Sequence, residues 1–197
     1  MFSLEELLVG VQAEATRQTP ILPSQLQQVM FTDSAIDSRE VTANSLFVAL
    51  PGARVDGHSF VADAVANGAR GALVNREKIE GMTLERPWVR VEPDGQGLEQ
   101  VTPETVLLIA VENPLDSFHR LAAYHRGLFA PTVIGITGSV GKTSTKEVTA
   151  AVLKRRYRTL KNPRSYNNES TLPIVLLQLT GNHEVAVLEM GCYGPGD

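Results

Sequence analysis

The sequence predicts an α/β fold with mostly parallel sheets, because strand-like and helix-like stretches alternate along it. An apolar stretch at 45–50 stops at Pro51-Gly52, which is typical of a short buried strand closed by a turn. Small and apolar residues at 59–67 then indicate a helix that ends at Gly68, and the apolar stretch 71–74 is typical of the next strand. Strand, helix and strand in this order predict a parallel βαβ unit.

Further elements are expected on both sides of this unit. Ser3 followed by Glu6 is typical of a capping box, so a helix is expected near the start of the chain. Two more apolar stretches, 88–91 and 105–111, predict additional strands of a small α/β unit.

A helix that is broken by a proline marks the predicted domain boundary. The helix begins at Pro114 and ends at Ala130-Pro131, and a fresh apolar strand follows at 132–136. We therefore expect a small α/β domain over 1–130 and the start of a second domain over 131–197.

Composition and charge narrow the class of protein. With 43% hydrophobic and 20% charged residues the chain falls in the globular range, and a formal net charge of −4 offers no basic field for a nucleic acid. Cys192 is the single cysteine, which excludes an intramolecular disulfide. The first residues lack the pattern of a signal peptide, and no apolar run is long enough to span a bilayer. We expect a cytoplasmic protein without nucleic-acid or membrane partners.

The most informative segment is a glycine-rich loop between the strand at 132–136 and a helical run. It consists of Gly138, Ser139, Val140, Gly141, Lys142, Thr143 and Ser144. In such a loop the glycines let backbone N–H groups converge on phosphate oxygens, the lysine reaches the outer phosphates, and the threonine offers its hydroxyl to Mg²⁺. The segment therefore predicts a phosphate-binding loop (P-loop) of the kind that binds a nucleotide with Mg²⁺.

The loop departs from the general G-x-x-x-x-G-K-[ST] pattern at one position, because the first glycine of that pattern would stand where the chain has Ile136. The alternative is a glycine-rich turn with a chance Lys-Thr pair. The apolar strand before the loop and the helix after it favour phosphate binding.

The segment 135–144 resembles the ATP loop of the Mur ligase family, whose T-G-x-x-G-K-T form accounts for this departure. The first domain resembles the UDP-binding domain of the same family at 37–39, 46–52 and 56–60. Within the family, Ser139-Val140, Lys146, Asn167-Asn168 and Pro173 are similar to the branch that adds D-alanyl-D-alanine to UDP-N-acetylmuramoyl-tripeptide.

The resemblance implies a reaction and its parts. ATP would phosphorylate the terminal carboxylate of the UDP-linked tripeptide, and the amine of D-alanyl-D-alanine would attack the acyl phosphate. Lys142 and Glu189 are the catalytic candidates, and Thr143 and Glu189 the metal ligands. The resemblance also implies that the protein is a monomer. It further implies that this chain is an N-terminal fragment and that the fragment is inactive alone. Rival interpretations are another Mur-type ligase, such as the third-residue-adding enzyme, and a non-catalytic nucleotide-binding module.

Glu189 follows the apolar residues 185–188, at the carboxyl end of a predicted strand where open parallel sheets bind ligands. The alternative is a carboxylate that merely ends a strand. Family members often have a histidine shortly after this glutamate, and Gly194 stands at the matching position.

Asn167 and Asn168 are implied to contact the nucleotide phosphates or the peptide, although asparagine pairs are also ordinary turn residues. By resemblance, Ser38 and Arg39 lie near the uracil and diphosphate of the substrate, and His58 lies near the nucleotide sugar. The alternative for Arg39 is a solvated side chain, and the alternative for His58 is a polar cap on its turn.

Overall fold

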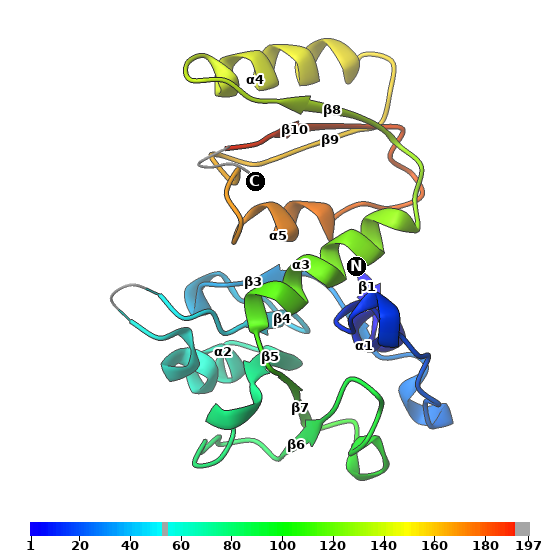
Figure 1. The fold of residues 1–197 in the computed structure, drawn as a ribbon, viewed down its shortest axis with the longest axis vertical. Helices are drawn as coiled ribbons and strands as arrows, with labels where there is room; N and C mark the ends of the chain where they lie inside the picture. Colours follow the sequence, from blue (N-terminus) through cyan, green and yellow to red (C-terminus); the bar gives the residue numbers. More distant parts are fainter. Residues whose placement is uncertain (53–54, 192–197) are drawn as a thin grey trace. The chain divides into compact units, whose positions relative to one another are not determined.

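A computed structural model of the chain describes residues 1–52 and 55–191. The chain forms two compact units, Met1–Tyr124 and His125–Asp197 (Figure 1). Both units carry parallel sheets, which confirms the predicted α/β class. Among the described residues, no helix combines the length and the apolar character needed to cross a membrane.

The first unit is built on a five-stranded parallel sheet in the order β3-β4-β5-β7-β6. The strands are β3 (Ser34–Ala35), β4 (Leu46–Val48), β5 (Gly71–Asn75), β6 (Trp88–Val91) and β7 (Val106–Val111). Strand β4, helix α2 (Val61–Ala66) and strand β5 form the predicted parallel βαβ unit. Gly68 ends that helix with a φ of 109°, a left-handed conformation that glycine adopts without steric cost.

Shorter elements surround this sheet. Strands β1 (Phe2–Ser3) and β2 (Met30–Phe31) pair antiparallel, and helices α1 (Leu4–Gly10) and α3 (Pro114–Gly127) begin and end the unit, the last turn of α3 belonging to the second unit. The predicted capping box is confirmed, because Ser3 Oγ accepts from the Glu6 N–H at 3.0 Å and the Glu6 carboxylate accepts from the Ser3 N–H at 3.1 Å. The 3₁₀ turns are Glu14–Thr16, Ser24–Leu26, Ser38–Glu40, Gly57–Phe60, Arg76–Lys78 and Leu98–Gln100.

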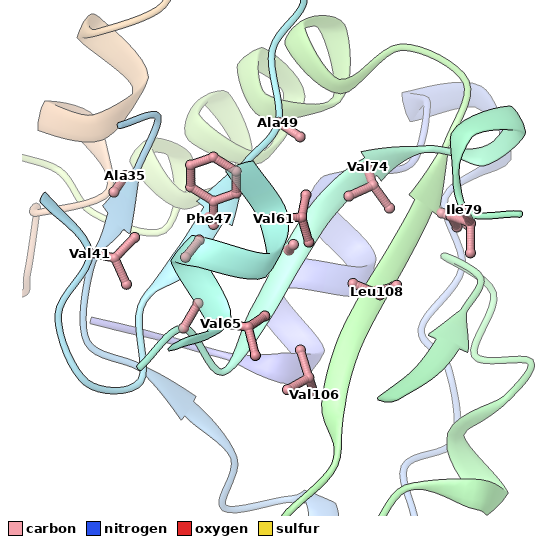
Figure 2. Packing of buried hydrophobic residues seen from close by; sticks show 14 residues of the cluster. Ala35, Val41, Phe47, Ala49, Val61, Val65, Val74, Ile79, Val106 and Leu108 are labelled. Atoms are coloured by element: carbon pink, nitrogen blue, oxygen red, sulfur yellow. The ribbon is translucent and has the colours of Figure 1, made fainter. Parts of the chain in front are cut away.

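Both faces of the sheet in the first unit are buried, as expected for a parallel sheet. Figure 2 shows one face, where Phe47, Val74 and Leu108 pack against Val61 and Val65 of helix α2. Neighbouring strand residues that point the other way, such as Leu46, Leu73 and Leu107, are fully buried as well. Burial on both faces therefore fixes the register of the strands, and it thereby fixes where the loops at their carboxyl ends begin.

The second unit has three layers. Strands β8 (Thr132–Ile136), β9 (Thr159–Lys161) and β10 (Val185–Glu189) form a parallel sheet in the order β8-β10-β9. Helix α4 (Lys142–Leu153) covers one face and helix α5 (Leu172–Leu176) the other (Figure 1). Val185 and Val187 pack with Ala150 on the α4 side, and Ala186 and Leu188 pack with Val175 on the α5 side.

The register of this sheet sets the position of the site. Glu189 is paired with Ile136, so the carboxylate stands at the carboxyl end of β10 directly beside the point where β8 ends. The glycine-rich loop begins two residues later and leads into α4. Parallel pairing therefore brings the loop and Glu189 to one edge of the sheet.

Candidate functional site

The glycine-rich loop has the backbone that an anion-binding loop needs. Gly138 has a φ of 144° and Gly141 a φ of 83°, both in the range that side-chain-bearing residues rarely adopt. Gly141 caps helix α4 without any side-chain hydrogen bond, so no side chain competes for the first N–H groups of the helix. The Lys142 ammonium donates to the Gly138 carbonyl at 2.6 Å, which folds the lysine back over its own loop.

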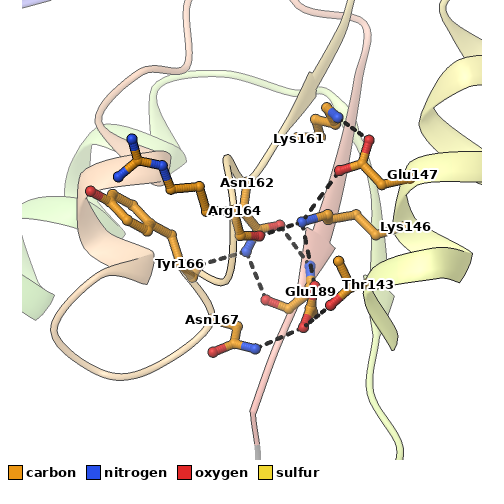
Figure 3. Close-up of polar contacts among 9 residues, drawn as sticks. All are labelled: Thr143, Lys146, Glu147, Lys161, Asn162, Arg164, Tyr166, Asn167 and Glu189. Atoms are coloured by element: carbon orange, nitrogen blue, oxygen red, sulfur yellow. Dashed lines mark hydrogen bonds and ion pairs between the residues drawn. The ribbon is translucent and has the colours of Figure 1, made fainter. Parts of the chain in front are cut away.

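Glu189 connects the glycine-rich loop to a second loop, the one between β9 and α5. Its Oε1 accepts from the hydroxyl of Thr143 at 3.1 Å and from the Asn167 side-chain amide at 2.7 Å (Figure 3). Glu189 is only 2% exposed, so these donors replace the water that a surface carboxylate would have. The structure therefore brings together three residues that the sequence singled out separately.

Asn162 fixes the backbone on which Glu189 stands. Its side-chain amide donates to the carbonyls of Tyr166 at 2.7 Å and Glu189 at 2.8 Å, and its Oδ1 accepts from the Glu189 N–H at 2.7 Å. The Asn162 side chain is fully buried. These hydrogen bonds hold together the end of β9, the end of β10 and the loop between β9 and α5 (Figure 3).

Lys146 lies one helical turn after Lys142 and is fully buried. Its ammonium donates to the Arg164 carbonyl at 2.7 Å and lies 3.4 Å from Glu189 Oε2. It is also 3.6 Å from Glu147, whose carboxylate forms an ion pair with Lys161. A buried cation thus faces one oxygen of the buried carboxylate, Oε2, while Thr143 and Asn167 donate to the other, Oε1 (Figure 3).

The carboxyl group of Glu189 is held in its charged form. Burial by itself would raise its pKa, but the hydrogen bonds from Asn167 and Thr143 and the nearby Lys146 ammonium outweigh burial and leave the pKa below its ordinary value. Oε2 has no hydrogen bond of good geometry within the described part of the chain, only the ion pair with Lys146. An ionised carboxylate with spare accepting capacity beside a threonine hydroxyl is a fitting donor set for Mg²⁺, which prefers oxygen ligands and keeps several waters.

No cluster of three or more His, Cys, Asp or Glu able to hold a metal occurs within 1–52 and 55–191. A cation at Glu189 would therefore depend on Thr143, water and a ligand for its remaining oxygens. Gly194, which stands where family members often have a histidine, lies outside the described residues.

The other residues of the predicted loop and turn have different surroundings. Ser139, Val140 and Ser144 are exposed, with Val140 at 91%. The Oδ1 of Asn168 accepts from the N–H groups of Ser170 and Thr171, so it shapes the turn that leads into α5. Asn167 reaches Glu189, whereas Asn168 builds the local turn, and a contact of either with phosphate stays a prediction.

The predicted substrate residues of the first unit follow the carboxyl ends of neighbouring parallel strands. Ser38 and Arg39 come after β3, and His58 comes after β4. Arg39 is exposed, and its guanidinium is held by Asp37 at 2.6 Å, which lowers the pKa of that carboxyl to about 2. Ser38 is buried, and its carbonyl accepts from the Asn67 side chain at 2.9 Å.

Both ring nitrogens of His58 have partners inside the first unit. Nδ1 lies 2.6 Å from the Asp56 carboxylate, and Nε2 accepts from the Asn75 N–H at 2.9 Å. Nδ1 therefore carries the proton and donates to Asp56. His58 ties its turn to the end of β5, and its role as a substrate contact stays a prediction.

An open cavity of about 660 Å³ also occurs in the first unit, lined among others by Gln12, Arg76 and Arg120. Its cations are engaged internally: Arg76 pairs with Glu92 at 2.8 Å, and Arg120 donates to the Val11 carbonyl at 2.9 Å. Ser38, Arg39 and His58 are absent from its lining.

Sequence reasoning gave no role to two residues that shape the site, Lys146 and Asn162. Asn162 directly follows β9, and a polar residue at the carboxyl end of a parallel strand is the signal that indicated Glu189. Lys146 is singled out only by the family resemblance, and its burial has no signal in the sequence, because a lysine four residues after Lys142 is usually solvated.

The fold and the loop define a class, a parallel α/β unit followed by an α/β domain of the P-loop type. Two family models match the chain: "Mur ligase family, catalytic domain" over residues 34–126 and "Mur ligase middle domain" over residues 136–197. The chain therefore belongs to the Mur ligase family.

Several curated relatives carry the name UDP-N-acetylmuramoyl-tripeptide--D-alanyl-D-alanine ligase. The protein of Bacillus subtilis is 35% identical over 185 residues, which cover 94% of this chain and 36% of that protein. The protein of Escherichia coli is 35% identical over 181 residues, which cover 91% and 35%. This chain spans about a third of the length of the relatives it matches.

Solved structures of the same kind of ligase share the fold. The D-alanyl-D-alanyl ligase from Acinetobacter baumannii has a TM-score of 0.70 and 31% identity, covering 100% of this chain and 37% of its own. The MurF ligase from Thermotoga maritima in complex with ADP has a TM-score of 0.60 and 32% identity, covering 86% and 34%.

Proposed function

We propose that the chain is part of an ATP-dependent ligase that joins D-alanyl-D-alanine to UDP-N-acetylmuramoyl-tripeptide through an acyl phosphate. Residues 1–130 would bind the UDP-linked substrate, and 131–197 would begin the ATP-binding domain. The observation that carries the proposal is the contact of Thr143 with Glu189 at the mouth of a glycine-rich loop. The relatives and the ADP complex of a similar ligase support it.

The second unit would hold the triphosphate. The N–H groups at the start of α4 and the Lys142 ammonium would bind phosphate oxygens, once the lysine leaves the Gly138 carbonyl. Thr143 and Glu189 would hold Mg²⁺, which would neutralise negative charge on the phosphates. Asn162 and Asn167 keep Glu189 aimed at the loop.

The first unit would hold the UDP moiety at the carboxyl edge of its sheet. Arg39 supplies an exposed cation that suits a diphosphate, and Asp37 limits the conformations of that guanidinium. Ser38 and His58 lie in the turns that follow β3 and β4. A cytoplasmic location fits an enzyme that consumes ATP.

The test is calorimetric titration of this chain with Mg-ATP and, separately, with the UDP-linked tripeptide. We expect saturable binding of both, with Lys142→Ala abolishing ATP binding and leaving tripeptide binding unchanged. Lys154→Ala, an exposed lysine at the end of the same helix, is the matched control and should leave both unchanged. Failure of a folded sample to bind either ligand would overturn the proposal, and ATP binding unaffected by Lys142→Ala would overturn the assignment of the loop.

A further inference from the structure

Lys146 is a fully buried cation that the proposed reaction does not use. It lies on α4 and reaches across to the carboxyl end of β10, where its ammonium is 3.4 Å from Glu189 Oε2. The second carboxylate nearby, Glu147, is half exposed and already pairs with Lys161. Glu189 is therefore the buried counter-charge of Lys146.

Charge neutralisation of this kind has a consequence for metal binding. A divalent cation is held mainly by negative oxygens, and buried charges interact strongly because water does not screen them. Here one buried carboxylate stands against one buried ammonium, and the described residues offer no further acidic ligand cluster. The protein side of the site thus carries no net negative charge with which to hold a free cation.

We infer that Lys146 makes this site selective for a metal–nucleotide complex over the free divalent cation. The inference rests on the proposed function and deepens it. With Lys146 in place, a divalent cation is retained at Thr143 and Glu189 only when phosphate oxygens supply the missing negative charge. Lys146 acts through Glu189, so it is a positioning and selectivity residue rather than a catalytic one.

A purely structural role for Lys146 makes a different prediction. Its hydrogen bond to the Arg164 carbonyl helps to hold a loop in which Arg164 has a φ of 48°. If only that bond mattered, removing the charge would loosen the loop and weaken the binding of every ligand. The selectivity role instead predicts a gain, namely tighter binding of the free metal, which a misfolded site does not produce.

Free Mn²⁺ is the probe, because its electron paramagnetic resonance signal disappears on binding and no nucleotide is needed. The variant is Lys146→Gln, whose amide can still donate toward the Arg164 carbonyl while carrying no charge. We expect the affinity for free Mn²⁺ to rise about tenfold or more over the unaltered chain, since a buried carboxylate loses its neutralising partner. Lys146→Arg, which keeps the charge, and Lys154→Gln, which removes an exposed one, should show no gain.

The double variant Lys146→Gln with Glu189→Gln locates the new binding. It should lose the gain, and a gain that survives there would mean that Glu147 or another group binds the metal, which overturns the inference. If Lys146→Gln does not fold, Lys146→Met serves as the second neutral variant. The unaltered chain adds its own test, because binding of free Mn²⁺ that is as tight as in Lys146→Gln and that Glu189→Gln abolishes would contradict the inference.

Failure of the inference is distinguishable from failure of the proposed function. A chain that binds Mg-ATP but gains no Mn²⁺ affinity in Lys146→Gln overturns the inference alone. A chain that does not bind Mg-ATP overturns the proposed function, and with it the inference that rests on it.

Discussion

The Thr143 hydroxyl donates a 3.1 Å hydrogen bond to Oε1 of Glu189, a residue 46 positions later in the chain. The contact exists because β8 and β10 are parallel neighbours, which places the loop after β8 beside the end of β10. Threonine, carboxylate and glycine-rich loop thereby converge at one edge of the sheet, where a phosphate-bound cation would need them.

The first prediction concerns the carboxylate itself. Glu189→Gln keeps the shape of the side chain but removes the negative charge, so Mg²⁺ should no longer improve the affinity for ATP. We expect a loss of about tenfold or more in the presence of Mg²⁺ and a much smaller change in its absence, measured by calorimetry with and without a chelator. Glu184→Gln, an exposed residue just before the same strand, is the control, and an equal effect there would contradict the assignment.

The second prediction concerns Asn162, the buried side chain that ties three segments together. Asn162→Ala removes three hydrogen bonds and leaves buried polar groups without partners, so it should lower the free energy of unfolding by about 2–4 kcal/mol. Denaturant unfolding measures the loss. Asn182→Ala, at an exposed position, should cost no more than about 0.5 kcal/mol, and similar losses in both variants would refute the structural role.

The third prediction is that two glycine-to-alanine substitutions differ in their effect on stability. Gly141→Ala forces a side chain into a φ of 83°, so it should destabilise the chain by about 1 kcal/mol and impair ATP binding. Gly127→Ala, at the end of α3, meets open space and has no positive φ, so it should be neutral or stabilise by up to about 1 kcal/mol. Thermal unfolding separates them, and equal shifts would count against the loop conformation.

The fourth prediction is a pH dependence in the first unit. The hydrogen bond from Arg39 lowers the pKa of Asp37 from its ordinary 3.8 to about 2. A carboxyl whose pKa is lower in the folded state stabilises the fold above its unfolded value, and this contribution is lost as the pH falls from about 4 toward 2. The contribution is small, because both side chains are partly or largely exposed and water screens them.

NMR titration of the Asp37 carboxyl tests this interaction. In Arg39→Gln its pKa should return toward the ordinary range, whereas Arg155→Gln, a change at an exposed arginine elsewhere, should leave it near 2. A low pKa that persists without Arg39 would show that another group is responsible.

Local patterns in the sequence predicted the secondary structure well. The capping box at Ser3 and Glu6, the βαβ unit and the loop before α4 depend on residues close together in the chain, and the structure confirms each of them. Glu189 could be placed because it ends an apolar stretch, and strand ends are where parallel sheets bind ligands.

Residues whose environment depends on tertiary packing could not be predicted in this way. On α4 the side chains of Val148 and Val152 are 65% and 64% exposed, while Lys146 is fully buried. Hydrophobicity alone would reverse this order. Lys146 is buried because Glu189 and the Arg164 carbonyl meet it from segments distant in the chain, and the engagement of both nitrogens of His58 is hidden for the same reason.

The measurement that tests the central claim most directly is amide chemical-shift mapping of the isotope-labelled chain titrated with a slowly hydrolysed Mg-ATP analogue. The account predicts saturable shifts concentrated at 138–144, Asn167 and Glu189, and none of these in Lys142→Ala. Shifts concentrated instead around the cavity lined by Gln12, Arg76 and Arg120, with the glycine-rich loop unchanged, would contradict it.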